Sequence, residues 1–252
     1  MNPPIKISTH EVRNGIFHGL SRAIPLRKPK TVFYDEKSGL KVDVRNKHLG
    51  QNHRDLLDFF WMNKGGYGNT FALRFNESYL LNQIKLSRSG RSVQLLRQKI
   101  LDLVDTNIHI ITPRKEYVFG IIKYYEKDIN GDYIIIFDEK YVAFMNENEH
   151  YFCDKVIIKK IIDEENAFIK AVLRFVFSHG FVNIDVQKLL DIFIGNENES
   201  QKRAQRRAKK ELEIFCEKSN FAGLKLSKNG YLQRQKKRTK STHMSKTPRS
   251  PK

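Results

Sequence analysis

The spacing of hydrophobic residues in the first half of the chain changes from a helical period to a strand period near residue 106. Apolar positions three and four residues apart predict helices, whereas runs rich in β-branched and aromatic residues predict strands. The expected helices cover about 51–63, 77–84 and 91–105, and the expected strands cover 107–112, 117–125 and 133–137. Asn130-Gly131, between the last two strands, is a strong hairpin signal. Helices followed by a β-hairpin in this order predict a winged helix.

The second half of the chain repeats this order without obvious sequence identity. The expected helices cover 163–178, 185–194 and 200–218, and strands 224–227 and 231–233 flank the turn Lys228-Asn229-Gly230. Asp185 is the expected N-cap of the short middle helix. The sequence therefore predicts an α+β fold of two tandem winged-helix domains.

The ends of the chain differ in composition from these two domains. The first 30 residues hold four prolines and many basic residues, and the last residues have no hydrophobic pattern. A hairpin of strands 31–34 and 40–44 is expected to open the first domain. The expected division is a flexible N-terminal arm over 1–30, a first winged-helix domain over 31–147, a second over 148–233, and a basic disordered tail over 234–252.

Positive charge is concentrated at the C-terminal end. The formal net charge is +18, and residues 201–252 hold 17 lysines and arginines against three acidic residues. Charge of this kind argues about partners rather than about fold. The expected partner is a polyanion, with nucleic acid first and an acidic membrane surface second.

The remaining composition indicates a cytoplasmic protein. The first residues, Met1-Asn2-Pro3-Pro4, lack the apolar core of a signal peptide, and no apolar run approaches the length of a membrane span. Two cysteines, Cys153 and Cys216, are too few for a disulfide framework in a chain of 252 residues. We therefore expect no membrane-spanning segment, and of the two polyanions we expect nucleic acid as the partner and no membrane.

The second helix of each helix-turn-helix is the candidate for reading DNA, because such helices place their first residues against base edges in the major groove. In the first domain, arginine and glutamine side chains face outward there, and these can pair with guanine and adenine. The hydroxyl-rich start at Ser87, Ser89 and Ser92 suits backbone phosphates at a helix N-terminus. The candidate DNA-binding residues are Arg88, Ser89, Arg91, Gln94, Arg97 and Gln98. The alternative interpretation is a polar face exposed to solvent.

In the second domain, the corresponding helix is more basic. Like charges at close spacing destabilise an isolated helix, and a polyanion opposite them relieves that cost. The candidate DNA-binding residues are Lys202, Arg203, Arg206, Arg207, Lys209 and Lys210 on this helix, with Lys228 at the hairpin tip. Lys127 and Lys225 are further wing residues within reach of a DNA backbone. A merely solubilising face would normally include acidic residues, and the first one is Glu211.

Signals for catalysis or cofactor binding are weak. Asn107-Ile108-His109-Ile110 lacks the first histidine of a relaxase metal motif, and Gly65-Gly66-Tyr67-Gly68 lacks the lysine of a phosphate-binding loop. His150 and Cys153 have a spacing seen in metal sites, but no second pair follows. We expect no catalytic residues, no metal and no cofactor.

A longer pattern over residues 40–105 resembles a known family. Leu49-Gly50-Gln51-Asn52-His53-Arg54-Asp55-Leu56-Leu57 opens the first helix after a short extended segment. Residues 71–75 then lead into Leu80-Leu81 and a serine-rich turn, and Leu95-Leu96 continues through 101–104 into strands. In this order the chain resembles plasmid replication initiators with tandem winged-helix domains, of the TrfA type within the iteron-binding Rep family.

The resemblance implies a function rather than an active site, because these initiators are not enzymes. It implies binding to double-stranded DNA at direct repeats of a replication origin, through both winged helices. It also implies melting of adjacent A·T-rich DNA and recruitment of a host replication initiator and a helicase or helicase loader. Some members form homodimers that limit plasmid copy number.

Two other functions remain open from the residues alone. A winged-helix transcriptional regulator would use the same binding chemistry, so a DNA-binding assay does not separate it from an initiator. An origin-nicking nuclease or relaxase is the alternative from the enzyme class, and cleavage of supercoiled DNA with Mg²⁺ or Mn²⁺ would reveal it.

Overall fold

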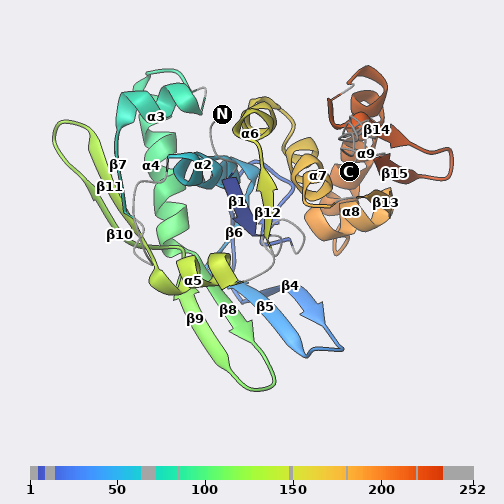
Figure 1. The fold of residues 1–252 in the computed structure, drawn as a ribbon, viewed down its shortest axis with the longest axis horizontal. Helices are drawn as coiled ribbons and strands as arrows, with labels where there is room; N and C mark the ends of the chain where they lie inside the picture. Colours follow the sequence, from blue (N-terminus) through green and yellow to red (C-terminus); the bar gives the residue numbers. More distant parts are fainter. Residues whose placement is uncertain are drawn as a thin grey trace, which may run out of the picture.

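A computed structural model describes most of the chain and has a mixed α and β fold (Figure 1). The described residues are 5–8, 15–63, 72–84, 86–147, 150–179, 181–219 and 221–234. Within them, no helix combines the length and the apolarity that crossing a bilayer requires. The basic tail was expected to begin at residue 234, but Arg234 is the last residue of strand β15 (Tyr231–Arg234) and donates to the carbonyl of Val176. The rest of the expected tail, from 235 onward, lies outside the described part.

The first structural unit is built around three helices and a three-stranded sheet. Its sheet has the antiparallel order β10–β11–β7, so the last strand lies in the middle. In chain order the elements are α2 (Gln51–Met62), β7 (Ala72–Asn76), α3 (Glu77–Gln83), α4 (Gly90–Asp105), β10 (Ile122–Lys127) and β11 (Asp132–Phe137). We call this the first unit. Strand β7, between the first two helices, was not predicted from the sequence.

The second unit has the same order of elements. Its sheet order, β13–β15–β14, again places the last strand in the middle. In chain order the elements are α7 (Ala167–Phe177), β13 (Val182–Asp185), α8 (Val186–Phe193), α9 (Glu199–Lys218), the short 3-10 helix η1 (Phe221–Gly223), β14 (Leu224–Leu226) and β15 (Tyr231–Arg234). The two units therefore repeat one plan.

The repeat extends to single hydrogen bonds at the hairpin tips. The amide of Glu77, the first residue of α3, donates to the carbonyl of Gly131 at 3.0 Å, and the amide of Val186 donates to Gly230 at 3.0 Å. Both glycines lie in the left-handed region, with φ of +82° and +79°, where a side chain would be strained. Each tip is therefore fastened to the start of the short helix in the same way.

The structure also contains a four-stranded sheet, two strands of which lie in the sequence between the helices of the first unit and its hairpin. It has the antiparallel order β4 (Lys30–Asp35), β5 (Leu40–Arg45), β8 (Asn107–Ile111) and β9 (Glu116–Gly120). The prediction of a single strand over 117–125 is wrong, because the strand is interrupted at Ile121, which is wholly buried. Strand β9 therefore joins this sheet, whereas β10 joins the sheet of the first unit.

The segment expected to be a flexible arm is instead part of the fold from residue 15 onward. Strand β2 (Phe17–His18) pairs in parallel with β6 (Lys47–Gly50), and β3 (Ile24–Pro25) pairs with β6 in the antiparallel sense. Phe17 is buried, and a Cβ on Gly50 would meet the carbonyl oxygen of Leu20 at 2.4 Å. Pro25, one of the prolines that suggested an arm, therefore lies in a paired strand. Residues 1–4 and 9–14 lie outside the described part.

The hydrophobic cores of the two units meet at a helix that was not predicted. After α5 (Glu139–Glu147), strand β12 (His150–Cys153) pairs with β1 (Ile5–Ser8), and α6 (Lys155–Asp163) follows. Ile158 and Ile162 of α6 belong to the first core, whereas Ile161 belongs to the second. The two cores thus divide within α6, and the segment just after residue 147 packs with the first unit.

A buried ionic contact joins α2 of the first unit to α7 of the second. The Arg174 guanidinium donates to Asp55 at 2.6 Å, to Asp58 at 2.7 Å and to the Gln51 side chain at 2.6 Å. Lys170, one turn earlier, donates to Asp55 and to a backbone carbonyl. All five side chains are buried. We call these residues the α2–α7 cluster, and they fix how the two units sit against each other.

Loss of Arg174 should strongly destabilise the protein. In Arg174→Leu, Asp55 keeps Lys170 and Asp58 keeps Arg54, but both lose the guanidinium that joins them. Breaking one side of a buried ion pair costs up to about 3–5 kcal/mol. Urea unfolding monitored by circular dichroism measures this loss. The matched control is Lys202→Ala, which removes an exposed ion pair with Glu199 and should change stability by less than about 1 kcal/mol. If Arg174→Leu lowers the free energy of unfolding by no more than Lys202→Ala does, the α2–α7 cluster does not hold the two units together.

Two buried histidines should make stability pH-dependent. Burial lowers the pKa of His48 from its ordinary 6.5 to about 4, helped by nearby Lys30, and burial and His48 lower the pKa of His18. Because the folded state holds both rings neutral, the unfolded chain takes up protons first as the pH falls below 6.5. Stability should therefore decrease from about pH 6.5 toward pH 4. For His48→Gln, the slope should be smaller by up to about 1.4 kcal/mol per pH unit; equal slopes would contradict this origin.

Candidate nucleic-acid interface

The DNA-binding residues expected from the sequence are all exposed, and they lie on α4, on α9 and at the tip of the second hairpin. On and before α4 these are Arg88, Ser89, Arg91, Gln94, Arg97 and Gln98. On α9 and the hairpin they are Lys202, Arg203, Arg206, Arg207, Lys209, Lys210 and Lys228. On each helix the opposite face is buried, and the exposed face is mostly polar, with Leu95 on α4 and Ile214 on α9 exposed as well.

The start of α4 has the geometry of an anion-binding helix end. Ser89 caps the helix by accepting the amide of Ser92 at 3.2 Å, and nothing lies within 4 Å of a Cβ built on Gly90. Open space before a helix N-terminus with exposed Arg88 and Arg91 beside it favours phosphate groups. Ser92 itself is buried, so its hydroxyl supports the cap rather than a ligand.

The other end of α4 is fastened to the core by one carboxylate. Asp102 accepts hydrogen bonds from Lys47 at 2.5 Å, from His53 at 3.0 Å and from Gln98 at 2.9 Å. Burial opposes the charged form, but these three donors outweigh it and hold the pKa of Asp102 well below its ordinary value of 3.8. The sequence did not reveal this anchor. It also accepts a hydrogen bond from the Gln98 amide, so this candidate already has a partner within the protein.

Helix α9 separates its buried and exposed faces more sharply. Ala208 and Leu212 are buried, and Gln205 is held inside by hydrogen bonds to Gly195 at 2.7 Å and Asp191 at 2.9 Å. Lys202 forms an exposed pair with Glu199 at 3.2 Å. Among the described residues, none forms an ion pair with the remaining basic side chains of the run, which are Arg203, Arg206, Arg207, Lys209 and Lys210. Their charge is therefore available to a polyanion.

The two hairpin tips differ in how their lysines are held. Lys228 is exposed at the tip between β14 and β15. Lys127, before the tip between β10 and β11, instead contacts Glu77 at 2.5 Å and lies 5.2 Å from the centre of the Tyr133 ring. The expectation that Lys127 reaches a DNA backbone is therefore weakened, because its charge already has a partner.

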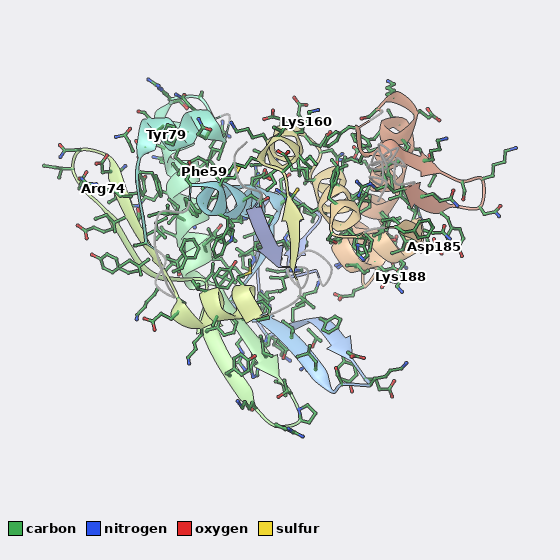
Figure 2. All side chains as sticks on the ribbon, viewed as in Figure 1. Phe59, Arg74, Tyr79, Lys160, Asp185 and Lys188 are labelled. Carbon is green, nitrogen blue, oxygen red and sulfur yellow. The ribbon has the colours of Figure 1, made fainter. Side chains whose placement is uncertain are left out.

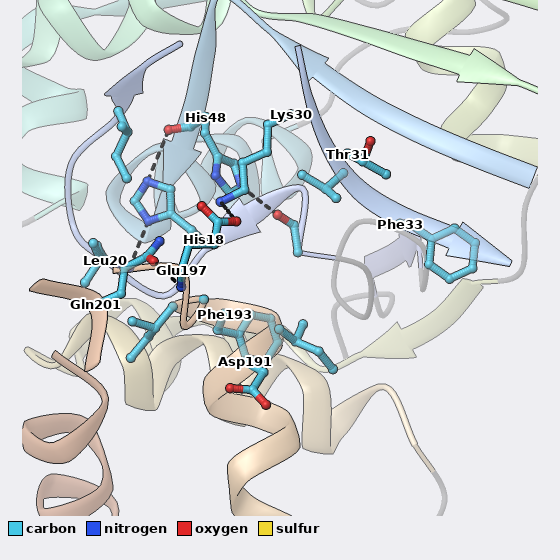
Figure 3. A pocket seen from close by; sticks show the side chains of 16 residues that line it. His18, Leu20, Lys30, Thr31, Phe33, His48, Asp191, Phe193, Glu197 and Gln201 are labelled. Atoms are coloured by element: carbon cyan, nitrogen blue, oxygen red, sulfur yellow. Dashed lines mark hydrogen bonds and ion pairs between the residues drawn. The ribbon is translucent and has the colours of Figure 1, made fainter. Parts of the chain in front are cut away.

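A pocket of about 320 Å³ lies between the N-terminal strands and the turn before α9 (Figure 3). Both histidines that line it are hydrogen-bonded to backbone carbonyls. His18 Nε2 bonds to the carbonyl of His48 at 3.1 Å, and His48 Nε2 bonds to the carbonyl of Gly15 at 2.7 Å. Lys30 approaches Glu197, in the turn before α9, at 4.0 Å. The histidine contacts thus hold the N-terminal strands together, and the Lys30 contact joins them to the turn before α9.

Sequence reasoning found the exposed basic residues but missed the groups that orient them. No role was predicted for Asp55 or Asp58 from the sequence, and the structure shows that both face α7. The available signal was Lys170 and Arg174, one turn apart in an otherwise apolar helix. Charged side chains at that spacing in such a helix indicate a buried partner.

Comparison with known proteins supports the fold. No family model and no curated protein sequence matches the chain. The crystal structure of RctB domains 2-3 matches with a TM-score of 0.52 and 12% identity, covering 83% of this chain and 91% of that one. A selenomethionine derivative of the same two domains matches with a TM-score of 0.53 and 12% identity, covering 89% and 96%. The chain therefore shares its two-unit fold with those domains.

The basic face of α9 should carry binding that depends on charge rather than sequence. Replacing Arg206 and Arg207 with alanine should weaken binding to every DNA duplex and reduce the salt slope by about two units, since each phosphate contact releases about one counterion. Fluorescence anisotropy over a series of salt concentrations measures both. The control is Lys37→Ala with Lys115→Ala, which removes two exposed charges from the turns of the four-stranded sheet. If the variant without Arg206 and Arg207 has the same salt slope as the wild type, these arginines do not contact phosphates and the basic face of α9 is only exposed to solvent.

Proposed function

We propose that the protein binds double-stranded DNA at direct repeats of a plasmid replication origin and initiates replication there. Each unit acts as a winged helix, with α4 and α9 entering major grooves and the second hairpin contacting the backbone. The observation that carries the proposal is the repeat itself: two units of one plan each expose the arginine- or lysine-rich face of the corresponding helix.

The arrangement of the helices supports two-site binding. Contacts run from α4 to α2, from α2 to α7 and from α7 to α9, so the two candidate helices flank the α2–α7 cluster (Figure 1). Packed helices lie about 8–10 Å apart where they cross, so three such contacts place α4 and α9 on opposite sides of the α2–α7 pair. Successive major-groove sites on one DNA face are about 34 Å apart. The proposal places the two helices in such successive grooves.

The shared fold supports the replication role in particular. RctB is a replication initiator, and the likeness of its domains 2-3 covers most of this chain. At 12% identity this likeness concerns the fold, so the origin, its repeats and the partners belong to the proposal. In the proposed mechanism, binding to the repeats helps to melt adjacent A·T-rich DNA in the cytoplasm. The bound protein then recruits a host initiator and a helicase or its loader, and a homodimer limits copy number.

The chemistry proposed for the chain is binding rather than catalysis. Cys153 is buried, and burial raises the pKa of its thiol to about 12, so it does not act as a thiolate nucleophile at neutral pH. His109 is buried between Arg45 and Glu116. These groups serve the fold, and the proposal assigns no enzymatic step and no cofactor.

Base preference should depend on α4. Replacing Arg91 or Gln94 with alanine should cost about 1–3 kcal/mol at the preferred repeat and relax discrimination at one base position. Binding to a panel of singly substituted repeats measures this. The matched control is Lys37→Ala, at a turn of the four-stranded sheet, which should leave the ranking of the panel unchanged.

The replication role has its own test. Footprinting on the DNA beside the gene should protect direct repeats of about two helical turns, and deletion of the gene should abolish maintenance of the replicon. Protection of a single palindrome upstream of an operon, with the replicon maintained unaided, would show a transcriptional regulator instead. Nicking of supercoiled origin DNA in the presence of Mg²⁺ or Mn²⁺ would show an enzyme.

A further inference from the structure

The tips of the two hairpins are structurally equivalent but chemically opposite. Asn130-Gly131 in the first unit corresponds to Asn229-Gly230 in the second, because both glycines accept the same helix-start hydrogen bond. Ile129 therefore occupies the position that Lys228 occupies in the second unit. The second tip presents a cation to solvent, whereas the first presents a branched apolar side chain.

The first tip holds this apolar side chain on a fixed support. The Asp128 carboxylate accepts the amides of Asn130 at 2.8 Å and Asp132 at 2.9 Å, and Gly131 is fastened to α3. Ile129 itself is fully exposed, at 101% of its reference area. A single exposed isoleucine is ordinary on a protein surface. A fully exposed one on a tip ordered by three hydrogen bonds is preorganised for contact, since little further entropy is lost on binding.

The charge around the first tip opposes contact with DNA. The first hairpin, 122–137, has two lysines against three acidic residues, whereas the second, 224–234, has three basic residues and no acidic one. Of the neighbouring cations, Lys127 is paired with Glu77, and Arg74, which lies beside the hairpin (Figure 2), is paired with Asp132 at 3.1 Å. Among the described residues, no cation pairs with two acidic side chains on the strand and turn that lead into this tip: Glu126, which accepts the Tyr124 hydroxyl, and Asp128, whose carboxylate lies in the turn. We call these two residues the acidic rim of the tip. Placing this rim against phosphates would be unfavourable.

We propose that the tip of the first hairpin docks into a protein that presents an apolar pocket rimmed by lysine or arginine side chains. Ile129 fills the pocket and the acidic rim meets its basic edge. This inference rests on the proposed function, because α4, α9 and the second hairpin are taken to hold DNA at the same time. In this proposal the second hairpin contacts DNA, whereas the first hairpin contacts the partner protein.

Substitutions at the two equivalent positions separate these roles. Ile129→Ser should leave the affinity for origin repeats within about twofold and the salt slope unchanged, because it alters no charge. It should nevertheless abolish replicon maintenance, and Ile129→Val should retain it. Lys228→Ser, the matched control, should weaken DNA binding and reduce the salt slope by about one unit. Loss of DNA binding in Ile129→Ser would overturn the proposal, because the tip would then be a wedge in the DNA. Normal maintenance in Ile129→Ser would overturn it as well.

Photo-crosslinking tests the nature of the partner directly. A benzophenone amino acid at position 129, in the full-length protein in cells that carry the replicon, should yield an adduct with one other protein. The same group at position 228 should yield adducts with DNA. Glu126→Lys, which reverses one rim charge, should abolish the protein adduct while DNA affinity is kept or increased. An adduct at position 129 with DNA, or with a second copy of the chain, would contradict the proposal.

Failure of the proposed function gives a different result from failure of this inference. If the wild-type protein binds no origin repeats, the origin-binding function fails whatever position 129 contacts. If the wild-type protein binds the repeats and Ile129→Ser behaves like wild type in cells, the docking inference alone fails.

Discussion

The buried contact between α2 and α7 is the constraint on which the arrangement of the molecule depends. Arg174 spans two carboxylates and one amide, and Lys170 shares one of those carboxylates. Removing such charges from water is costly, and their mutual attraction recovers the cost only in a narrow range of geometries. An apolar contact of the same size would tolerate sliding and rotation. The ionic cluster therefore constrains the angle between the two units.

That angle matters because each candidate DNA helix is fastened to its own side of the cluster. On one side, Asp102 ties α4 to His53 of α2 and to Lys47 of β6. On the other, Asn166, the residue that caps α7, donates to Glu211 of α9, and α9 also packs on α7. A change at the cluster would thus be transmitted to both helices. Binding that needs two grooves at once is sensitive to such a change, whereas binding by one unit is not.

The repeat shows which parts of the plan tolerate divergence. The sheet orders, the capped short helices and the left-handed glycines are the same in both units, because each is required to close the same backbone turns. The exposed positions differ: α9 carries six basic residues over 202–210 with no acidic residue among them, α4 mixes arginine with glutamine, and the tips carry Lys228 and Ile129. One scaffold thereby presents surfaces of different chemistry.

Local patterns in the sequence determined the helices of both units, the hairpin turns and the exposed basic faces. They did so because a helix's period and a turn's glycine are properties of neighbouring residues. Strand β7, the split at Ile121 and the packing of residues 15–25 depended on pairing with distant segments, so no local pattern revealed them. The same holds for the site. The outward positions of Arg91 and Arg206 followed from helical spacing, whereas the burial of Asp55, Asp58 and Arg174 was decided only when two helices more than 100 residues apart met.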